Sequence, residues 1–423
     1  PIFFINFLWE CAMSDTNSNR PIKPLSAAEH GIMVGSPPPP EKRITHENWD
    51  FPPYNRWSFQ HVREVLPTVP ISRDSGSATA LPEAMQDLDN LPVSLKNAGR
   101  DTTVFSALES TYTDGFIVIH KGRVVYERYL NDMTPATLHL SQSMAKSVTG
   151  TVCGILIHSG VIDRDQPIGE IIPELSESGY ADATLRSLLD MRSGVRFGED
   201  YTDPNDDIGK VDVAAGWKPH RQGLPTAMQD LPQTLVKERE HGGNFQYRSI
   251  ETDVMAWVME RKTGKRLAQL IAEELWQPMG AEQDACFTVD RGGYALAEGG
   301  LNACLRDYAR VGLLYLNDGM VGDTQLVPAE WVRETRQDGD KQAFLDYVYA
   351  SHYPNGAYKN QFWIRDVEKQ QIMARGVFGQ MIYVDPANDL VMAKLSTWPD
   401  FVDLGYSLDT MDVIDAVAAA LAD

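Results

Sequence analysis

Apolar runs with the two-residue period of β-strands lie towards both ends of this 423-residue chain, and helical patterns fill the stretch between them. Residues 116–120 and 123–129 flank a Lys121-Gly122 turn and predict a β-hairpin. Further strands are predicted at residues 361–364, 381–385 and 390–395. We therefore expect an α+β fold, with an antiparallel sheet assembled from both ends of the chain, flanked by helices, and an all-α region inserted between them.

The predicted elements divide the chain into an arm and two regions. Residues 13–50 are polar and Pro-rich, and residues 1–50 should form an N-terminal arm, largely extended. Natural folding should begin near Met13, with the short apolar run at residues 1–9 part of an upstream segment, residues 1–12. Residues 51–155 and 295–423 should form the α/β region with the central antiparallel sheet. Residues 156–294 should form the all-α region, with helical patterns at 184–191, 225–240, 252–262 and 267–276, and a last helix is expected at 407–421.

The composition excludes several classes of partner. A formal charge of −21 and a pI near 4.8 leave no basic face for nucleic acid or an anionic membrane. Four scattered cysteines form neither a disulfide framework nor a zinc pattern, so we expect reduced thiols, a cytoplasmic location and no metal or organic cofactor. No run is long enough to cross a membrane. The expected partner is a small-molecule substrate, and a homodimer is left open.

The clearest chemical signal is the tetrapeptide Ser143-Met144-Ala145-Lys146, the single S-x-x-K of the chain, at the predicted start of a buried helix. Residues three apart lie on one helix face, so a lysine with a depressed pKa can take the hydroxyl proton of the serine and activate it as a nucleophile. The positive end of the helix would favour an oxyanion beside Ser143. The alternative is an ordinary helix start, with Ser141 or Ser143 as the cap and a solvated Lys146.

Two later stretches fit the same chemistry. Tyr247 precedes a predicted helix, and a phenol near a lysine ammonium can relay a proton; its alternative is a core tyrosine followed by a Ser249 cap. Gly376 and Gly379 open a predicted strand, where a backbone amide could act as a second oxyanion donor beside the amide of Ser143. The alternative for this stretch is an ordinary glycine-rich strand entry.

These three stretches, in this order, resemble the serine β-lactamase and penicillin-binding-protein superfamily, whose marks are S-x-x-K, Y-x-N or Y-x-S, and a K-T-G-like strand. Within it, residues 51–61, 190–217, 247–258, 287–312 and 361–398 resemble the 6-aminohexanoate-dimer hydrolase (nylon-oligomer hydrolase) branch, which is related to family VIII carboxylesterases. The resemblance covers nearly the whole chain beyond residue 45. It implies the penicillin-recognising-enzyme fold, with the active site in a cleft between the α/β and all-α regions.

The resemblance also implies roles for single residues. Ser143 matches the nucleophile, Lys146 the base and Tyr247 the proton relay, and the amides of Ser143 and Val377 match the oxyanion hole. In the same way, Tyr201 and Asp212 match positions that line the substrate cleft, where a tyrosine helps to close the site and an aspartate can meet a substrate ammonium. The remaining positions expected at the substrate are Glu298, Gly376 and Phe378.

The chain departs from the family pattern at two places. Lys262-Thr263-Gly264 spells K-T-G but ends a predicted helix, where Gly264 is expected as a C-cap; the true strand carries no lysine, although Arg375 precedes Gly376. Glu298 stands where nylon-type enzymes carry a neutral or imidazole side chain. An added carboxylate there would either favour a cationic substrate or be solvated.

The expected function is therefore a serine hydrolase that cleaves an amide or ester bond of a small linear molecule through an acyl-enzyme on Ser143. The alternatives within the same chemistry are a family VIII-type carboxylesterase and a β-lactamase-like or D-Ala-D-Ala peptidase. A catalytically silent, ligand-binding member of the fold is the non-enzyme alternative. The chain lacks G-x-S-x-G and H-E-x-x-H, which disfavours a Ser-His-Asp hydrolase or a metal hydrolase.

Overall fold

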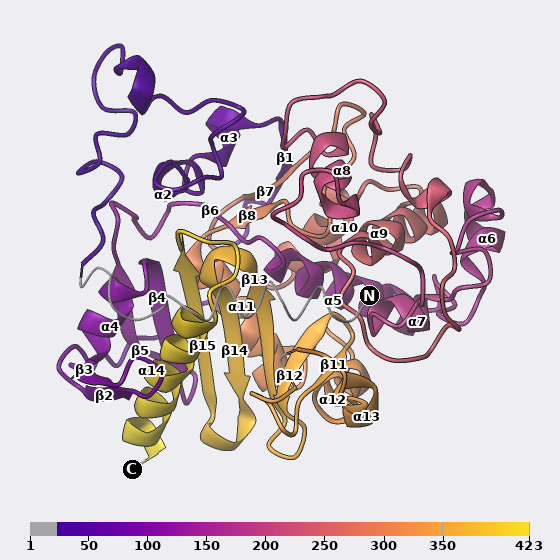
Figure 1. The fold of residues 1–423 in the computed structure, drawn as a ribbon. Helices are drawn as coiled ribbons and strands as arrows, with labels where there is room; N and C mark the ends of the chain where they lie inside the picture. Colours follow the sequence, from indigo (N-terminus) through magenta and orange to yellow (C-terminus); the bar gives the residue numbers. More distant parts are fainter. Residues whose placement is uncertain (1–22, 349, 423) are drawn as a thin grey trace.

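A seven-stranded antiparallel sheet forms the centre of the computed structural model, which describes residues 23–348 and 350–422 (Figure 1). The expectation for residues 1–12 therefore lies outside the described residues. In spatial order the strands are β11 (Ala357–Lys359), β12 (Phe362–Asp366), β13 (Gln371–Gly376), β14 (Gln380–Asp385), β15 (Leu390–Ser396), β4 (Thr113–His120) and β5 (Arg123–Tyr129). The pairing of β15 with β4 joins the two ends of the chain, as the sequence predicts.

Alternate residues of the central strands enter two separate cores. Ile117 and Ile119 of β4 belong to a cluster that includes α5 (Met144–His158) and α11 (Leu305–Leu316). Phe116 and Val118 belong to a second cluster with α4 (Val104–Ser110) and α14 (Leu404–Ala422). Figure 1 shows α14 across the front of the sheet and α11 behind it. Because both faces are covered, these strands are apolar throughout and could be recognised in the sequence.

The predicted hairpin and the three predicted C-terminal strands are confirmed as β4, β5, β12, β14 and β15. The last helix, predicted at 407–421, is also confirmed, as α14. The remaining elements around the sheet are short: β2 (Pro92–Leu95), β3 (Arg100–Thr103), β9 (Met320–Val321), β10 (Thr324–Gln325), α12 (Ala329–Gln337), α13 (Lys341–Phe344) and the turn η6 (Pro386–Asn388). Within the described residues, no helix combines the length and the apolar character needed to cross a membrane.

The inserted region is mainly helical but not all-α. Its helices are α6 (Ile168–Ile171), α7 (Leu185–Leu189), α8 (Asp207–Ala214), α9 (Ile250–Thr263) and α10 (Leu267–Ile271), with the turns η2 (Pro173–Leu175), η3 (Pro232–Thr234) and η4 (Ala272–Trp276). The helix predicted at 225–240 is wrong, because only η3 forms there. The strand β7 (Ala285–Thr288) also lies in the range predicted as all-helical. It forms because β1 (Thr68–Ile71), far away in the sequence, and β8 (Leu301–Ala303), shortly after it, both pair with it.

The described part of the N-terminal arm packs against the body. It contains η1 (Pro40–Lys42) and leads into α2 (Asn55–Ser58) and α3 (Val62–Val65). Trp49 is fully buried, and its indole Nε1 donates to the carbonyl of Trp217 at 2.9 Å. The arm is thus a covering segment held by the inserted region.

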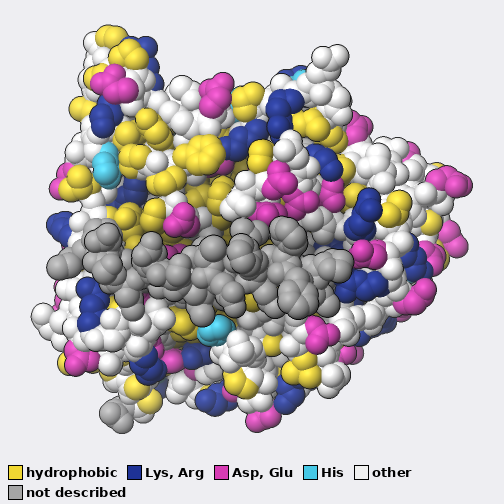
Figure 2. Space-filling view, in the orientation of Figure 1, with side chains coloured by type: hydrophobic (Ala, Val, Ile, Leu, Met, Phe, Trp, Pro, Cys, Tyr) yellow, Lys and Arg dark blue, Asp and Glu magenta, His cyan; other side chains and the backbone are white. Residues whose placement is uncertain are grey.

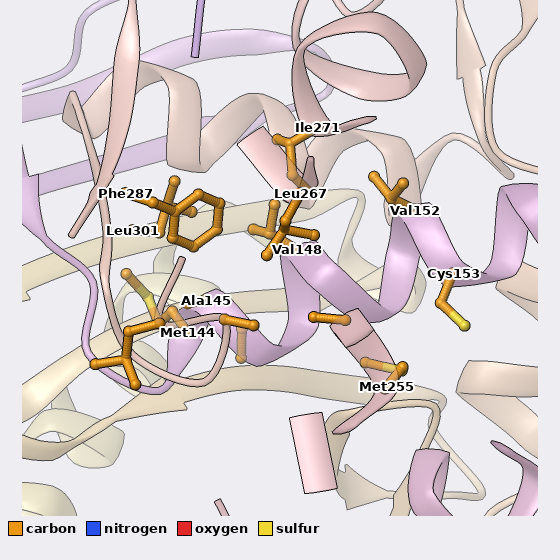
Figure 3. Close-up of a cluster of buried hydrophobic side chains, with 14 of the residues drawn as sticks. Met144, Ala145, Val148, Val152, Cys153, Met255, Leu267, Ile271, Phe287 and Leu301 are labelled. Carbon is orange, nitrogen blue, oxygen red and sulfur yellow. The ribbon is translucent and has the colours of Figure 1, made fainter. Parts of the chain in front are cut away.

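Helix α5 lies at the boundary between the sheet and the inserted region. Its side chains are buried on every side, which agrees with the predicted buried helix after Ser143. Figure 3 shows Met144, Ala145, Val148 and Val152 of α5 packed among Leu267 and Ile271 of α10, Phe287 of β7 and Leu301 of β8. A rigid, buried helix is a suitable support for a nucleophile at its first turn.

Candidate active site

Ser143 stands at the N-terminal end of α5, in helical conformation (φ −62°, ψ −4°), and makes no capping hydrogen bond through its side chain. The hydroxyl of Ser141 donates to the carbonyl of Gln142 instead. Gln142 has a φ of +49°, an unfavourable conformation for a residue with a side chain. The helix-cap explanation of this stretch is therefore wrong for both serines.

Lys146 is fully buried and surrounded by oxygen atoms. Its Nζ lies 2.9 Å from Ser143 Oγ, 2.8 Å from the carbonyl oxygen of Glu298 and 2.8 Å from Glu298 Oε2. Burial alone would lower the pKa of Lys146, but the charges of Glu298, Tyr247 and Glu199 outweigh it, so this pKa is raised. The depressed lysine pKa that the sequence argument assumed is therefore wrong; Lys146 is held as an ammonium.

Tyr247 faces the same pair of residues from the loop before α9. The centre of its ring lies 5.2 Å from Lys146 Nζ, and its phenol interacts with the side chain of Ser143. The ring stacks on Trp363 at 5.3 Å. Burial raises the pKa of Tyr247 more than Lys146 lowers it, so the phenol keeps its proton at neutral pH. Ser249, its expected capping neighbour, makes no side-chain cap.

The end of β13 lies directly against the turn that carries Ser143. A Cβ atom on Gly376 would stand 2.5 Å from the carbonyl oxygen of Ser141 and 3.0 Å from the amide nitrogen of Ser143, so only glycine fits. Val377 follows at the start of η5 (Val377–Gly379), and Phe378 takes a φ of +61°. The amide of Phe378 is bound to the carbonyl of Phe401 at 2.8 Å. This close approach places the backbone of Gly376, directly before Val377, against the turn that carries the Ser143 amide.

The predicted substrate residues Tyr201 and Asp212 come from the inserted region. Tyr201 is half-buried, stacks on Phe401 at 5.8 Å and donates from its hydroxyl to Glu199 Oε1 at 2.6 Å. Phe401 in turn lies 4.9 Å from Phe378, so an aromatic wall runs from the strand end to Tyr201. Asp212 lies on α8, and burial, reinforced by Asp50 and Glu298, raises its pKa well above the ordinary value.

Glu298 differs from both sequence expectations. Its side chain is only 8% exposed and is ion-paired with Lys146, so it is neither solvated nor a free acceptor for a substrate cation. The K-T-G tripeptide at 262–264 ends α9, with Gly264 at a φ of +69°, which confirms it as a helix C-cap. Arg375 donates from Nη2 to Ser407 Oγ of α14 at 2.7 Å.

Two acidic residues near the site were missed from the sequence. Glu199 accepts hydrogen bonds from the amide and hydroxyl of Ser249, besides that of Tyr201, and burial raises its pKa to about 7. Asp253 of α9 accepts from the amides of Ala297 at 2.9 Å and Glu298 at 3.4 Å. Both residues have hydrogen-bond partners that lie some fifty positions away in the sequence, so no local motif points to these contacts.

Among residues 23–348 and 350–422, no group of three or more His, Cys, Asp or Glu side chains could hold a metal ion.

Figure 2 shows hydrophobic side chains gathered between two raised parts of the surface. Phe51 and Val402 are among the large apolar side chains that remain exposed.

The family model described as Beta-lactamase matches residues 105–409. The chain belongs to this family and has its fold, and it is an enzyme, a serine hydrolase. It is 36% identical over 396 residues to the 6-aminohexanoate-dimer hydrolase of Paenarthrobacter ureafaciens, with 92% of this chain and 96% of the relative covered.

Solved structures agree with this assignment. The structure named "Putative 6-aminohexanoate-dimer hydrolase from Bacillus anthracis" superposes with a TM-score of 0.81 and 28% identity, covering 91% of this chain and 99% of the other. A family VIII carboxylesterase shares the fold, with a TM-score of 0.52 at 17% identity over 74% of this chain and 96% of the other. The sequence-based resemblance to this branch is confirmed.

Proposed function

We propose that this protein hydrolyses an amide bond of a small linear molecule, with esters as accepted substrates, through an acyl-enzyme on Ser143. The observation that carries the proposal is the distance of 2.9 Å between Ser143 Oγ and Lys146 Nζ, with Tyr247 beside both. A binding protein has no need for a buried lysine on a serine hydroxyl, since burying an amine is costly unless it is paired. The similarity to an amide hydrolase over 92% of the chain supports the same conclusion.

In the proposed mechanism, Ser143 Oγ attacks the carbonyl carbon while its proton passes towards Lys146. The developing oxyanion accepts hydrogen bonds from the amides of Ser143 and Val377, at the positive end of α5. Tyr247 keeps its proton at neutral pH, so it can protonate the leaving amine or alcohol. Water then releases the acyl group from Ser143 by the reverse proton path.

The substrate class follows from Tyr201, Asp212 and the aromatic wall. Tyr201 and Phe401 would cover an apolar linear chain, and Asp212 would meet an ammonium at its end. Since the pKa of Asp212 is raised well above the ordinary value, an arriving cation would restore its charge and release a proton. The dimer of 6-aminohexanoate, named for the Paenarthrobacter relative, carries both features and is the first substrate to test.

The test uses the whole purified chain. A fluorophosphonate probe and a p-nitrophenyl ester are offered to the wild type and to Ser143→Ala, followed by a panel of linear amides with free or capped amino ends. Labelling and turnover that vanish in Ser143→Ala support the proposal. Wild-type protein that shows neither, or a Ser143→Ala variant that retains both, contradicts it.

Two further properties belong to the proposal. We infer a cytoplasmic location, supported by the free, buried thiols of Cys153, Cys286 and Cys304, which suit a reducing compartment. Cell fractionation tests it. The homodimer that the sequence leaves open is tested by light scattering of the purified protein, where a monomeric mass would exclude it.

A further inference from the structure

The ammonium of Lys146 has no lone pair available for the Ser143 proton. An ammonium has three N–H groups, and Lys146 Nζ has three acceptors: Ser143 Oγ at 2.9 Å, the Glu298 carbonyl at 2.8 Å and Glu298 Oε2 at 2.8 Å. The raised pKa of Lys146 agrees with this charged state. Lys146 can therefore accept the Ser143 proton only if one of its own protons leaves.

Only one of the three acceptors can take that proton at low cost. Ser143 is the group being deprotonated, and a backbone carbonyl is a very weak base. The Oε2 atom of Glu298 belongs to a carboxylate, which lies at hydrogen-bond distance and is buried together with the lysine. The proton that leaves Lys146 therefore passes to the carboxylate of Glu298.

Several elements hold in place the backbone of the loop that carries this carboxylate. The amides of Ala297 and Glu298 are both bound by Asp253 Oδ1 of α9. Thr149 of α5 donates to the carbonyl of Ala297 at 3.3 Å. A Cβ atom on Gly300 would stand 2.3 Å from Thr288 Oγ1, so the loop is fitted closely against β7. Such support from three elements is what a preorganised catalytic group requires.

We propose that Glu298 is a positioning residue that stores a proton for Lys146 during catalysis, so that the effective base of this enzyme is the Lys146–Glu298 pair. This inference rests on the proposed function of Ser143. As Ser143 attacks, its O–H bond breaks and an N–H bond forms at Lys146, while an N–H bond of Lys146 breaks and an O–H bond forms at Glu298 Oε2. When the tetrahedral intermediate collapses, Tyr247 gives its proton to the leaving group. The proton stored on Glu298 then returns through Lys146 and replaces the proton that Tyr247 has lost.

Glu298 shares its surroundings with other titratable groups, which contribute to any pH profile. They come from every element packed around it: Lys146 of α5, Asp253 of α9, Asp212 of α8, Glu199 and Tyr201 of the loop before α8, and Tyr247. The negative charge of Glu298 raises the pKa of Asp253 and that of Glu199, after burial as the main cause for both. A variant is therefore compared over the whole pH range and not at one pH.

The test is the pH dependence of kcat/KM on a p-nitrophenyl ester, from about pH 5 to 10, for the wild type, Glu298→Gln and Glu298→Asp. Without the carboxylate, Lys146 must lose a proton to solvent before attack, so the acid limb of Glu298→Gln should move to higher pH. Activity at about pH 7 should fall by about 100-fold or more and return as the pH rises. Glu298→Asp should keep the acid limb at the pH of the wild type, with a lower kcat/KM.

A purely structural ion pair predicts the opposite shift. If Glu298 only held Lys146 in its inactive charged form, Glu298→Gln would lower the pKa of Lys146 and move the acid limb to lower pH. That result, or an unchanged profile, overturns the proposal. The matched control is Glu330→Gln, because the side chain of Glu330 is 73% exposed on α12, and its profile should equal the wild type.

A measurement on the wild type alone tests the proposal if Glu298→Gln does not fold. The rate at which a fluorophosphonate labels wild-type Ser143 should stay level through the pH range in which amines titrate; a continued rise there overturns the proposal. Absence of any labelling in the wild type would instead refute the function of Ser143. The two failures are thus distinguishable.

Discussion

Replacing Gly376 with alanine should damage catalysis far more than folding. The added Cβ would lie 2.5 Å from the carbonyl oxygen of Ser141 and 3.0 Å from the amide nitrogen of Ser143, both of them backbone atoms. Ordinary van der Waals contact begins near 3.4 Å, so the end of β13 must move away from α5 by about 1 Å. A displacement of about 1 Å at a catalytic group costs about 100-fold in rate, and loss of one oxyanion donor costs about 100- to 1,000-fold.

The assay for Gly376→Ala is steady-state hydrolysis of a p-nitrophenyl ester, with thermal unfolding measured on the same samples. We expect kcat to fall by about 100-fold or more, while unfolding free energy falls by only about 1–3 kcal/mol. Gly76→Ala is the matched control, because no atom lies within 4 Å of a Cβ at that position. Near wild-type kcat in Gly376→Ala would refute the oxyanion role of this strand end.

Three further changes test other parts of the site. Tyr247→Phe should lower kcat more for an amide than for a p-nitrophenyl ester, because nitrophenolate leaves without a proton; equal losses would contradict the relay. Burial raises the pKa of Glu199 from 4.5 to about 7, so folding favours its protonated form, and its contribution to stability falls as the pH rises between these values. As the pH rises across that range, the free energy of unfolding in urea should fall less for Glu199→Gln than for the wild type, by up to about 3 kcal/mol. An equal pH dependence of the two proteins would contradict the raised pKa of Glu199. Asp212→Asn should raise KM for an amide with a free amino end and leave KM for its acetylated form unchanged; equal changes would exclude the ammonium contact.

The sheet was largely predictable because its signals are local. Strands β4, β14 and β15 are buried along their whole length, so they are largely apolar runs, and a tight turn follows β4 and β14. The short strands β1, β7 and β8 carry no comparable signal, since β1 pairs with β7, and β8 with β6 (His139–Leu140), across long stretches of sequence. Residues 225–240 mislead in the other direction, because Pro232 interrupts the weak helical pattern and only η3 forms there. Met228, Leu231 and Leu235 are nevertheless buried.

The reaction chemistry was predictable for a similar reason. Ser143 and Lys146 are three residues apart on one helix, so their contact follows from helix geometry alone. The sequence could not predict the charge state of Lys146, because its pKa depends on Glu298, which lies 152 residues away. The expectation of a depressed lysine pKa was wrong for this reason.

The sequence by itself determined the fold class, the family and the Ser143–Lys146 pair, since periodicity and helix spacing are properties of neighbouring residues. Tertiary structure alone decided how these groups are ionised and aligned. The burial of Glu298 beside Lys146, the raised pKa of Tyr247 and the contact of Gly376 with the Ser143 turn all join distant segments. Electrostatic energies depend on distance and burial in space, and only the folded chain sets those quantities.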